Sequence, residues 1–521
     1  MNERHTFQTM NQLLRRNAAL YPTKTAMQEF ETGKSHTFSQ LAERAARIGN
    51  ALYGLGLSPL DRVSVLSQNS FEYAELFTSV PASGLTLVPL NFRLAVPEVI
   101  GVLNDAGARV LFLQDQYRQF ADQIKTQVPS LEHFIYIGPK TDAPTGWLAY
   151  EEFVGSASAD ALDRVIDEDD AAFFMYTSGT TGLPKGVIQT HLNHYHLART
   201  TALHHDLKHW DIGFTCCPMY HATAYCSFFG TFFMGATNIL FQKFDPATLF
   251  KAAQEYHISA GMLATPMVRM ILDAADKLKE YDHKSLKKLW FAGAGITPAV
   301  WRQFVDIYGS ILGQHMGTTE TTGSNTFISK EEVARELALG NERILASCGT
   351  SSIDMDTQIV DDHDHVITRG IGEMRTRGLG LTKGYWNKEE QTKHAFRKGW
   401  FYTEDICEVD EKGYIYVIDR KKDMIITGGE NVYPTEIESI IDTHPSVKES
   451  CVIGIPHPVW GEAIAVAVVC EASVTKDDII AYCKGKIAGY KMPKSVFFIP
   501  DLPRNASGKV LKAELRKQFT G

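Results

Sequence analysis

Short apolar runs alternate with amphipathic stretches over most of the chain. Four runs rich in Val, Leu, Ile and Phe predict buried strands, at residues 62–67, 86–90, 108–113 and 133–138. Between them, residues 38–56 and 97–108 repeat apolar positions at the spacing of an amphipathic helix. Strands that alternate with helices in this way predict a parallel sheet covered by helices.

The pattern changes from about Gly349 onward. Short strand-like segments separated by turns predict a more antiparallel, barrel-like subregion, at residues 356–368, 372–378 and 413–420. After Arg420, a helical pattern at 437–445 and an apolar run at 463–470 predict a compact α+β unit.

The length of 521 residues exceeds the roughly 250–300 residues at which a single core stops growing. We therefore predict an α/β fold with at least two domains. The large N-terminal domain, residues 1–421, would contain helix-covered β-sheets and the barrel-like subregion. The small α+β C-terminal domain, residues 422–521, would be mobile and would follow a tight hinge near residues 419–423.

The composition is that of an ordinary globular protein, with 44% apolar and 22% charged residues, which excludes a disordered chain and a coiled-coil rod. The net charge is −9, whereas a nucleic-acid binder usually carries a basic excess. Eight cysteines do not indicate a disulfide framework, and the first ten residues lack the apolar run of a signal peptide. We expect a reduced, cytoplasmic protein with no nucleic-acid partner.

Residues 212–242 contain no Asp, Glu, Lys or Arg. The segment is longer than the roughly 20 residues that cross a bilayer. Pro218, His221 and Asn238 interrupt it, however, and no other part of the chain resembles it. We therefore expect a buried helix that forms the wall of a pocket, and no transmembrane span.

The strongest chemical signal is the segment YTSGTTGLPKG, residues 176–186, which follows an apolar strand. Hydroxyl groups, exposed backbone N–H groups and one lysine suit the binding of a polyphosphate, and glycines let the backbone approach the anion. The segment is not a Walker A loop, because Pro184 precedes Lys185 and Gly186 follows it. The alternative interpretation is an ordinary turn rich in Gly and Thr.

This segment resembles the phosphate loop of the adenylate-forming superfamily, which includes acyl-CoA synthetases, luciferases and the adenylation domains of peptide synthetases. Further motifs resemble that superfamily in the same order, at residues 318–320, 372–387, 399–405, 419–438 and 502–509. The resemblance extends from about residue 20 to residue 515 and therefore covers nearly the whole chain.

The resemblance implies a site for ATP and Mg²⁺. The loop and its lysine would hold the β- and γ-phosphates, through Thr177, Ser178, Gly179, Thr180, Thr181, Gly182 and Lys185. Thr319 would contact the α-phosphate, and Glu320 with Thr177 would organise Mg²⁺. Asp405 would accept hydrogen bonds from both ribose hydroxyls, and Arg420 would reinforce the ribose and phosphate contacts.

The adenine side departs from the family pattern. Three residues would lie along the base: Ala292, Gly293 and Ala294. Residues 314–320 match the family's Q-x-Y-G-x-T-E and add Met316, Gly317 and Thr318 to the nucleotide site. Met316 replaces the aromatic residue that stacks on adenine, and a thioether packs on a ring with less directional gain, so weaker ATP binding is one consequence.

A second departure lies in the ribose motif. The family's T-G-D reads Thr403-Glu404-Asp405 in this chain, so Glu404 stands where glycine is usual. The aspartate is retained, while Glu404 adds a charge beside it.

The resemblance assigns the first chemical step to Lys509. Attack of a carboxylate on the α-phosphate builds negative charge, and a lysine brought to that point stabilises the charge in the transition state. The alternative is that Lys509 is one more charge of a basic tail, because residues 484–521 hold nine Lys or Arg and two Asp or Glu.

The acid would bind beside the charge-free segment. His221 resembles the family's histidine at the mouth of the acyl pocket, and the lining would include Ala222, Thr223, Tyr225 and Ser227. An adenylation domain for amino acids would need an acidic residue here, and this segment has none. The resemblance therefore implies a carboxylic acid without a free α-amine.

The second half-reaction would depend on the hinge. Lys422 stands where the family places its hinge residue, and Gly428 and Gly429 open the GGEN segment that would face the pantetheine of coenzyme A. One orientation of the C-terminal lid domain would deliver Lys509, and the other would present GGEN.

The histidines form two groups in the sequence, His191, His194 and His196, then His204, His205 and His209. No Cys or acidic residue completes a set at zinc-like spacing, so we interpret them as residues of a surface helix and loop. Residues 361–365, DDHDH, predict a polar turn between two strands.

Together these features predict an AMP-forming carboxylate–CoA ligase. Its cofactor would be Mg²⁺, and its co-substrates would be ATP and coenzyme A. The acid would be a medium- or long-chain fatty acid. The alternatives are an aryl or cyclic acid, a carrier protein in place of coenzyme A, a luciferase-like monooxygenase and a non-catalytic nucleotide sensor. The oligomeric state is left open, a homodimer included.

Overall fold

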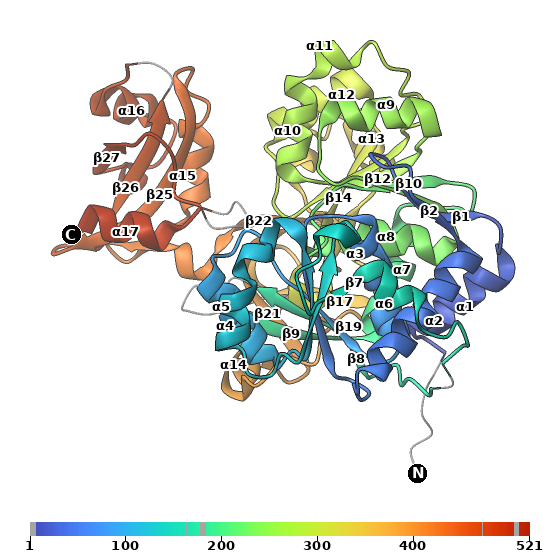
Figure 1. Cartoon of the computed structure of the whole chain (residues 1–521). Helices are drawn as coiled ribbons and strands as arrows, with labels where there is room; N and C mark the ends of the chain where they lie inside the picture. The colour runs from blue at the N-terminus through green and yellow to red at the C-terminus, as the bar shows by residue number, and fades with distance from the viewer. Residues whose placement is uncertain (1–6, 163, 178–183, 471–472, 505–509, 521) are drawn as a thin grey trace. The chain divides into compact units, whose positions relative to one another are not determined.

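The computed structural model describes residues 7–162, 164–177, 184–470, 473–504 and 510–520. Two compact units make up the chain (Figure 1). The large unit contains residues 1–357 and 376–401, and the small unit contains residues 358–375 and 402–521. The predicted lid boundary between residues 421 and 422 falls inside the small unit, and movement of the lid stays a prediction.

Seven strands form the first sheet of the large unit, in the order β7-β6-β5-β3-β4-β8-β9. Their bounds are Arg62–Leu66 (β3), Thr86–Pro89 (β4), Val110–Gln114 (β5), His133–Ile137 (β6), Leu148–Ala149 (β7), Ala171–Thr177 (β8) and Lys185–Thr190 (β9). Neighbouring strands are parallel from β7 to β8, and β9 is antiparallel to β8. The four strands expected from the apolar runs are therefore confirmed as β3 to β6.

The helices that precede or connect these strands are α1 (Met10–Leu20), α2 (Phe38–Gly54), α3 (Phe71–Ala82), α4 (Val96–Ala106), α5 (Ala121–Gln127) and α6 (Tyr150–Gly155). A capping box begins α2, in which the Thr37 side chain accepts from the Gln40 backbone and Gln40 accepts from the Thr37 backbone. Gly107 ends α4 in the left-handed region, at φ +62°. Both predicted helices, at 38–56 and 97–108, are confirmed.

Nine strands form the second sheet, in the order β16-β15-β14-β13-β12-β10-β11-β1-β2. Their bounds are Thr25–Glu29 (β1), Ser35–Thr37 (β2), Ile212–Thr215 (β10), Thr237–Leu240 (β11), Ala260–Ala264 (β12), Lys288–Ala292 (β13), Leu312–Met316 (β14), Thr326–Ile328 (β15) and Thr350–Ser351 (β16). The strands from β1 through β11, β10, β12 and β13 to β14 are parallel, so their carboxyl ends lie on one edge of the sheet.

The helices of this half of the large unit are α7 (His191–His204), α8 (Ala222–Met234), α9 (Pro246–Tyr256), α10 (Thr265–Asp273), α11 (Ala275–Leu278), α12 (Pro298–Tyr308), α13 (Lys330–Ala338) and α14 (Glu389–Ala395). The charge-free segment forms β10, α8 and β11, and α8 is buried along most of its length, which confirms the buried helix. Its Phe229 ring stacks on Phe77 of α3 at 5.1 Å between centroids. Among the described residues, no helix combines the length and the apolar character needed to cross a membrane.

A third sheet of six strands follows, in the order β18-β17-β19-β21-β20 with β22 on β21. Its strands are Met355–Val360 (β17), Val366–Ile367 (β18), Gly370–Gly378 (β19), Phe396–Arg397 (β20), Trp400–Val409 (β21) and Ile415–Arg420 (β22). The pairs β17–β18, β20–β21 and β21–β22 are antiparallel, as predicted. The polar turn at 361–365 is confirmed between β17 and β18, where the Asp361 carboxylate accepts from the backbone of His363 and His365.

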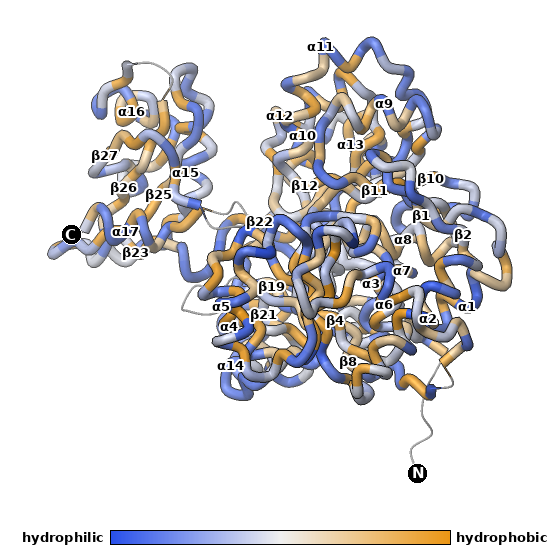
Figure 2. The backbone as a smooth tube through the Cα atoms, viewed as in Figure 1, coloured by the Kyte–Doolittle hydropathy of each residue, from blue (hydrophilic) through white to orange (hydrophobic). Residues whose placement is uncertain are grey.

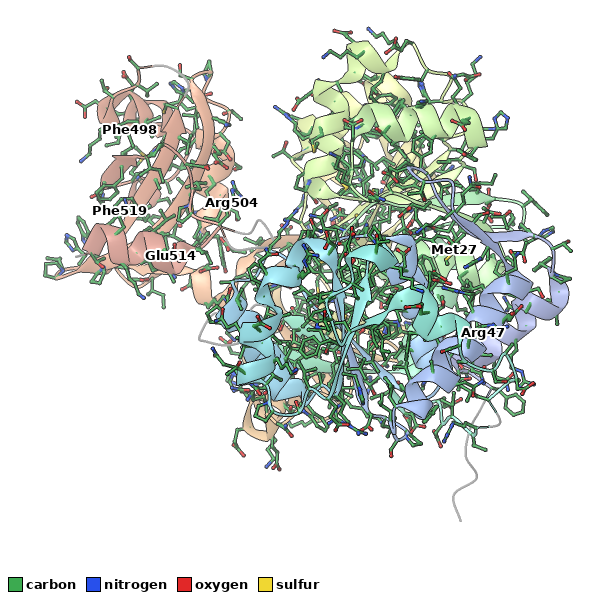
Figure 3. All side chains as sticks on the ribbon, in the orientation of Figure 1. Met27, Arg47, Phe498, Arg504, Glu514 and Phe519 are labelled. Atoms are coloured by element: carbon green, nitrogen blue, oxygen red, sulfur yellow. The ribbon has the colours of Figure 1, made fainter. Side chains whose placement is uncertain are left out.

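The small unit ends in the expected α+β arrangement. Five strands pair in the order β24-β23-β26-β25 with β27 on β26. The elements are Ile425–Thr427 (β23), Glu430–Val432 (β24), Pro434–Ile441 (α15), Val447–His457 (β25), Gly461–Cys470 (β26), Lys476–Cys483 (α16), Ser495–Phe498 (β27) and Lys512–Thr520 (α17). Phe519, which is labelled in Figure 3, fixes α17 to the sheet, because its ring stacks on Phe497 of β27 at 3.9 Å. Figure 2 shows apolar residues concentrated along the strands of both units.

The expectation of surface histidines on α7 is wrong. His191, His194, His196 and His205 are buried, His204 is half-buried, and of the six only His209 is exposed. The reason is that α7 packs along α8 and against β8 and β9, so its polar side chains face the interior. Some of their ring nitrogens have internal partners, as in the hydrogen bond of 2.8 Å between His194 Nε2 and Gln189 Oε1.

Three histidine rings lie close together beside β13 and β14. His205 stacks on Trp290 at 3.6 Å, and His204 stacks on Phe327 at 3.8 Å. His315 lies 6.2 Å from His204 and 6.0 Å from His205 between ring centroids. Burial lowers the pKa of His204 to about 3 and that of His315 to about 4. The cluster is therefore neutral at physiological pH.

We expect the free energy of unfolding to fall as the pH is lowered from about 6.5 to about 4. Histidines of the unfolded chain titrate near 6.5, whereas folded His315 has a pKa of about 4, so the unfolded state binds more protons in this window. The variant His315→Leu should flatten the pH dependence by up to about 1.4 kcal/mol per pH unit. Urea unfolding at a series of pH values measures the slope.

The control for this measurement is His363→Gln, because His363 is exposed in the turn between β17 and β18. Its slope should match that of the unchanged protein. A His315→Leu variant with that same slope would contradict the explanation.

Candidate active site

Several of the predicted nucleotide and acid residues lie beyond the carboxyl ends of neighbouring strands in the second sheet. The strands β14, β13, β12 and β10 are neighbours in the second sheet. Residues 317–320 follow β14, residues 293–294 follow β13, and His221 lies beyond the end of β10. Ligands of open parallel sheets bind outside this edge. The fold thus aligns the predicted adenine, phosphate and acyl positions along one edge.

The adenine side consists of backbone that is open to a ligand. Ala292 ends β13 half-buried, and Gly293 and Ala294 are exposed. Gly293 has φ +102°, a conformation that favours glycine. The hydroxyl of Thr265 donates to the carbonyl of Ala294 at 2.5 Å. Met316 is half-buried at the end of β14. This loop therefore has a fixed path before any ligand binds.

Gly317 is required by close packing. A Cβ atom at this position would lie 1.9 Å from the carbonyl carbon of Gly323. The turn that follows is held by Thr318, whose backbone N–H donates to the Thr321 hydroxyl at 3.1 Å. Only glycine therefore lets the chain pass from Met316 into the turn at Glu320.

The residues that are predicted to bind phosphate begin at the paired strands β8 and β9. Thr177 stands opposite Lys185 in the register of these antiparallel strands. The loop that connects the two strands contains five residues that are predicted to bind phosphate: Ser178, Gly179, Thr180, Thr181 and Gly182. These positions lie outside the described residues. Lys509 also lies outside them. The roles of these six residues stay predictions.

The turn that carries Glu320 is held by contacts from two other segments, β9 and the segment around Tyr385. Glu320 lies in a single turn, Thr319–Thr321. The hydroxyl of Tyr385 donates to Glu320 Oε1 at 2.7 Å, and the side chain of Gln189 on β9 donates to the carbonyl of Thr319 at 2.9 Å. The ammonium of Lys185 lies 4.9 Å from the centre of the Tyr385 ring. Lys185 and Glu320 thus both contact the same tyrosine, from its ring face and its hydroxyl.

Sequence reasoning assigned no role to Tyr385 or Gln189. Tyr385 belongs to the segment 372–387, which carries part of the family resemblance. Its distance from Glu320 in the sequence corresponds to no helix or strand period, so periodicity could not pair them.

His221 begins α8 and caps it. Its Nδ1 accepts a hydrogen bond from the backbone N–H of Thr223 at 3.2 Å. This bond leaves the proton of the neutral ring on Nε2. Burial, together with the charge of Arg93, lowers the pKa of His221. At neutral pH the ring can therefore donate one hydrogen bond through Nε2 beside the positive end of the helix dipole.

The other predicted acyl residues use their polar atoms inside the protein. The Thr223 hydroxyl lies 3.0 Å from His221 Nδ1, and the Ser227 hydroxyl bonds to the carbonyl of Phe214. Tyr225 packs between Phe77 and Phe173, at 4.6 and 5.3 Å between centroids. Ala222 is half-buried in the first turn. That these side chains line an acyl pocket stays a prediction.

The small unit contains a preformed ion pair between two residues predicted to bind the ribose. Asp405 on β21 and Arg420 on β22 are register partners, and Arg420 Nε lies 2.7 Å from Asp405 Oδ1. Arg420 also donates to the carbonyl of Thr403 at 3.1 Å. Asp405 is only 3% exposed. The geometry holds this carboxylate in one orientation, as a ribose ligand would require.

The residues that are predicted to form the hinge and to face the pantetheine also lie in the small unit. Lys422 is exposed in the single turn Lys421–Asp423. Gly428 and Gly429 form the turn between β23 and β24, with φ of +60° and +87°. Both glycines are exposed. In the part of the chain that the structure describes, no group of three or more His, Cys, Asp or Glu is arranged to hold a metal ion.

Comparison with known proteins gives matches along the whole chain. Residues 14–386 match the family model described as AMP-binding enzyme, and residues 436–509 match the one described as AMP-binding enzyme C-terminal domain. The chain is 34% identical over 515 residues to the long-chain-fatty-acid–CoA ligase FadD13 of Mycobacterium tuberculosis, with 98% of each chain covered.

Two further matches agree with these. The chain is 32% identical over 511 residues to a feruloyl-CoA synthase of Amycolatopsis sp, covering 97% of this chain and 98% of the other. The solved structure of ATP-bound MatB from Rhodopseudomonas palustris is similar at a TM-score of 0.87 and 28% identity, covering 98% of this chain and 99% of the other.

We expect Glu404→Gly to stabilise the protein. Glu404 is exposed and has φ +61°, in the left-handed region, where a side chain costs about 1–2 kcal/mol per residue. The greater freedom of glycine in the unfolded chain offsets roughly half of this gain. The free energy of unfolding should rise by about 0.5–1 kcal/mol, as measured by urea unfolding. Glu404→Ala keeps the Cβ atom and should give no such gain; equal stabilisation by both would refute the argument.

Proposed function

Because this chain belongs to the family of AMP-binding enzymes, as an AMP-forming CoA ligase, we propose that it activates a medium- or long-chain fatty acid. In the first step the carboxylate attacks the α-phosphorus of ATP and releases pyrophosphate, which leaves an acyl-AMP. In the second step the thiol of coenzyme A attacks the acyl carbon, loses its proton and displaces AMP. The observation that carries the choice of acid is the uncharged wall formed by residues 212–242.

Several polar side chains of this wall are occupied by contacts within the protein itself. Ser227 bonds to Phe214, Thr223 contacts His221, and Tyr225 packs in an aromatic cluster. A substrate that needs hydrogen bonds along its length would find few of them here. An aliphatic chain needs none, since its binding depends on apolar area removed from water.

A small apolar pocket lies beside the proposed acyl entrance. Its lining includes Leu66, Phe92, Val99 and Phe120. Phe92 contacts Tyr220, the residue before His221, at 5.2 Å between ring centroids.

His221 would bind the reacting end of the acid. Its Nε2–H can donate to an oxygen of the carboxylate, and the N-terminus of α8 favours an anion at the same place. Neutral histidine suits this role, because the proton stays on the ring while the anhydride forms.

The nucleotide would be held through its phosphates and its ribose. Thr177, Lys185 and Thr319 are proposed for the phosphates, and Asp405 with Arg420 for the ribose. Residues 292–294 would lie along the base. Lys509 would stabilise the charge that builds on the α-phosphate during attack.

The residues present fit Mg²⁺. The Glu320 carboxylate and the Thr177 hydroxyl supply hard oxygen ligands, which this ion prefers. When bound, the ion would neutralise charge on the phosphates of ATP.

A second candidate is an aryl acid, because one of the relatives is named a feruloyl-CoA synthase. Pyrophosphate release with a panel of fatty and aryl acids decides between the two. We expect kcat/KM to rise with chain length by about fourfold per methylene, from about 0.8 kcal/mol for each buried CH₂, and dodecanoate to exceed ferulate.

The same panel is run with and without coenzyme A. Release that accelerates with coenzyme A and yields AMP plus thioester supports the ligase. Release unaffected by coenzyme A, with acyl-AMP retained, would instead indicate a carrier protein as the acceptor. A preference for ferulate over every fatty acid would overturn the proposed substrate class.

We expect Lys422→Pro to separate the two half-reactions. A proline restricts φ at the proposed hinge, so thioester formation should fall by about tenfold or more while pyrophosphate release in the absence of coenzyme A is retained. Single-turnover assays of each step measure this. Lys422→Ala removes the charge without restricting φ and serves as the control. Equal loss in both steps would contradict a hinge at this position.

A further inference from the structure

Tyr385 contacts the two charged groups proposed for the phosphate side. Its hydroxyl donates to Glu320 Oε1 at 2.7 Å, and the face of its ring lies 4.9 Å from Lys185 Nζ. Hydrogen bonds to a carboxylate and cation–π contacts at this distance both fix side-chain geometry. One residue therefore contacts both the proposed Mg²⁺ ligand and the proposed phosphate lysine.

The backbone holds Tyr385 against the strand that carries Lys185. Trp386 donates to the carbonyl of Gly186 at 2.8 Å, and Ile188 donates to the carbonyl of Gly384 at 3.0 Å. Tyr385 itself forms an antiparallel bridge with Val187. The segment 384–386 thus extends the sheet beyond β9.

Side-chain contacts fix the ring as well. The backbone N–H of Tyr385 donates to the hydroxyl of Thr392 on α14 at 3.0 Å. The ring meets Phe396 edge to face at 6.0 Å, and the residue is 9% exposed. Because backbone and ring are both held, the hydroxyl has a defined position before any ligand binds.

We infer that Tyr385 is a positioning residue for the first half-reaction. Its hydroxyl orients the Glu320 carboxylate toward the Mg²⁺·ATP complex, and its ring supports the ammonium of Lys185. The inference rests on the proposed function, because it takes Glu320 and Lys185 as ligands of that complex. Tyr385 acts through these two residues and forms no bond to the reacting atoms.

The first test separates the hydroxyl from the ring. Tyr385→Phe keeps the packing against Phe396 and removes the hydrogen bond to Glu320. We expect Mg²⁺·ATP to bind about tenfold to a hundredfold more weakly by calorimetry, as for a lost hydrogen bond to a charged group. Binding of ATP without Mg²⁺ should change by less than about twofold, since Lys185 retains its contact.

A matched control variant removes the same kind of hydrogen bond, from a tyrosine to a carboxylate, in another part of the protein. The hydroxyl of Tyr136 donates to Asp115 Oδ1 at 2.8 Å, in a part of the first sheet that the proposed site does not use. Tyr136→Phe should bind Mg²⁺·ATP as the unchanged protein does. If Tyr385→Phe does the same, Tyr385 has no positioning role.

A double-mutant cycle with Glu320→Gln tests whether Tyr385→Phe weakens Mg²⁺·ATP binding through the Glu320 carboxylate. If Tyr385 acts through the carboxylate, the loss caused by Tyr385→Phe should shrink to less than about twofold once Glu320 is uncharged. A residue that merely stabilises the fold would give the same factor in both backgrounds, and that outcome would overturn the inference.

Failure of the proposed function gives a different result. If the unchanged protein releases no pyrophosphate with any acid, the proposed substrate class fails, while the binding measurements still decide the role of Tyr385. If it releases pyrophosphate but Tyr385→Phe matches Tyr136→Phe in both binding and rate, only the inference about Tyr385 fails.

Discussion

The register of the parallel strands β10, β12, β13 and β14 is the constraint on which the rest of the structure depends. Phe291 lies opposite Gln314, and Gly213 lies opposite Ala260. Because side chains alternate between the faces of a sheet, a shift of one residue would move every side chain of a strand to the opposite face. Parallel pairing also brings all carboxyl ends to one edge. That edge gathers segments that lie far apart in the sequence, and the chemistry of the site follows from their meeting there.

Behind this edge the large unit has a polar interior that supports the site. His194 on α7 bonds to Gln189 on β9, and the same amide donates to the carbonyl of Thr319. The turn that carries Glu320 is therefore held from the interior through Gln189 and from the other side through Tyr385. Hydrogen bonds in a buried network of this kind are stronger than in water. The neutral state of His194, whose pKa burial lowers, is consistent with its place in this chain of hydrogen bonds.

Much of the fold can be predicted from the sequence because it depends on local patterns. Apolar runs gave β3 to β6, and the charge-free segment gave the buried helix α8. The α7 histidines could not be predicted, since a helix covered on several sides shows no polar stripe to distinguish its faces. Motifs identified Glu320 and Lys185, but Tyr385 joins them only through tertiary contacts. The left-handed backbone at Glu404 is likewise visible only in its φ angle, although the glycine usual at that position is its sequence signal.

The two halves of the proposed site select their ligands by different physics. The nucleotide half presents charges whose positions are fixed in advance, such as the Asp405–Arg420 pair and the Glu320–Tyr385 bond. Sites of this kind discriminate sharply, because an ill-fitting ligand leaves buried polar groups unpaired. The wall built from α8 uses its hydroxyls internally. If it binds the acid as proposed, it would discriminate by apolar area, at about 0.8 kcal/mol for each methylene. It would then rank acids by length and would not reject an acid of nearly the same length. Relatives that share the nucleotide half can therefore differ in the acid they take through changes confined to this wall.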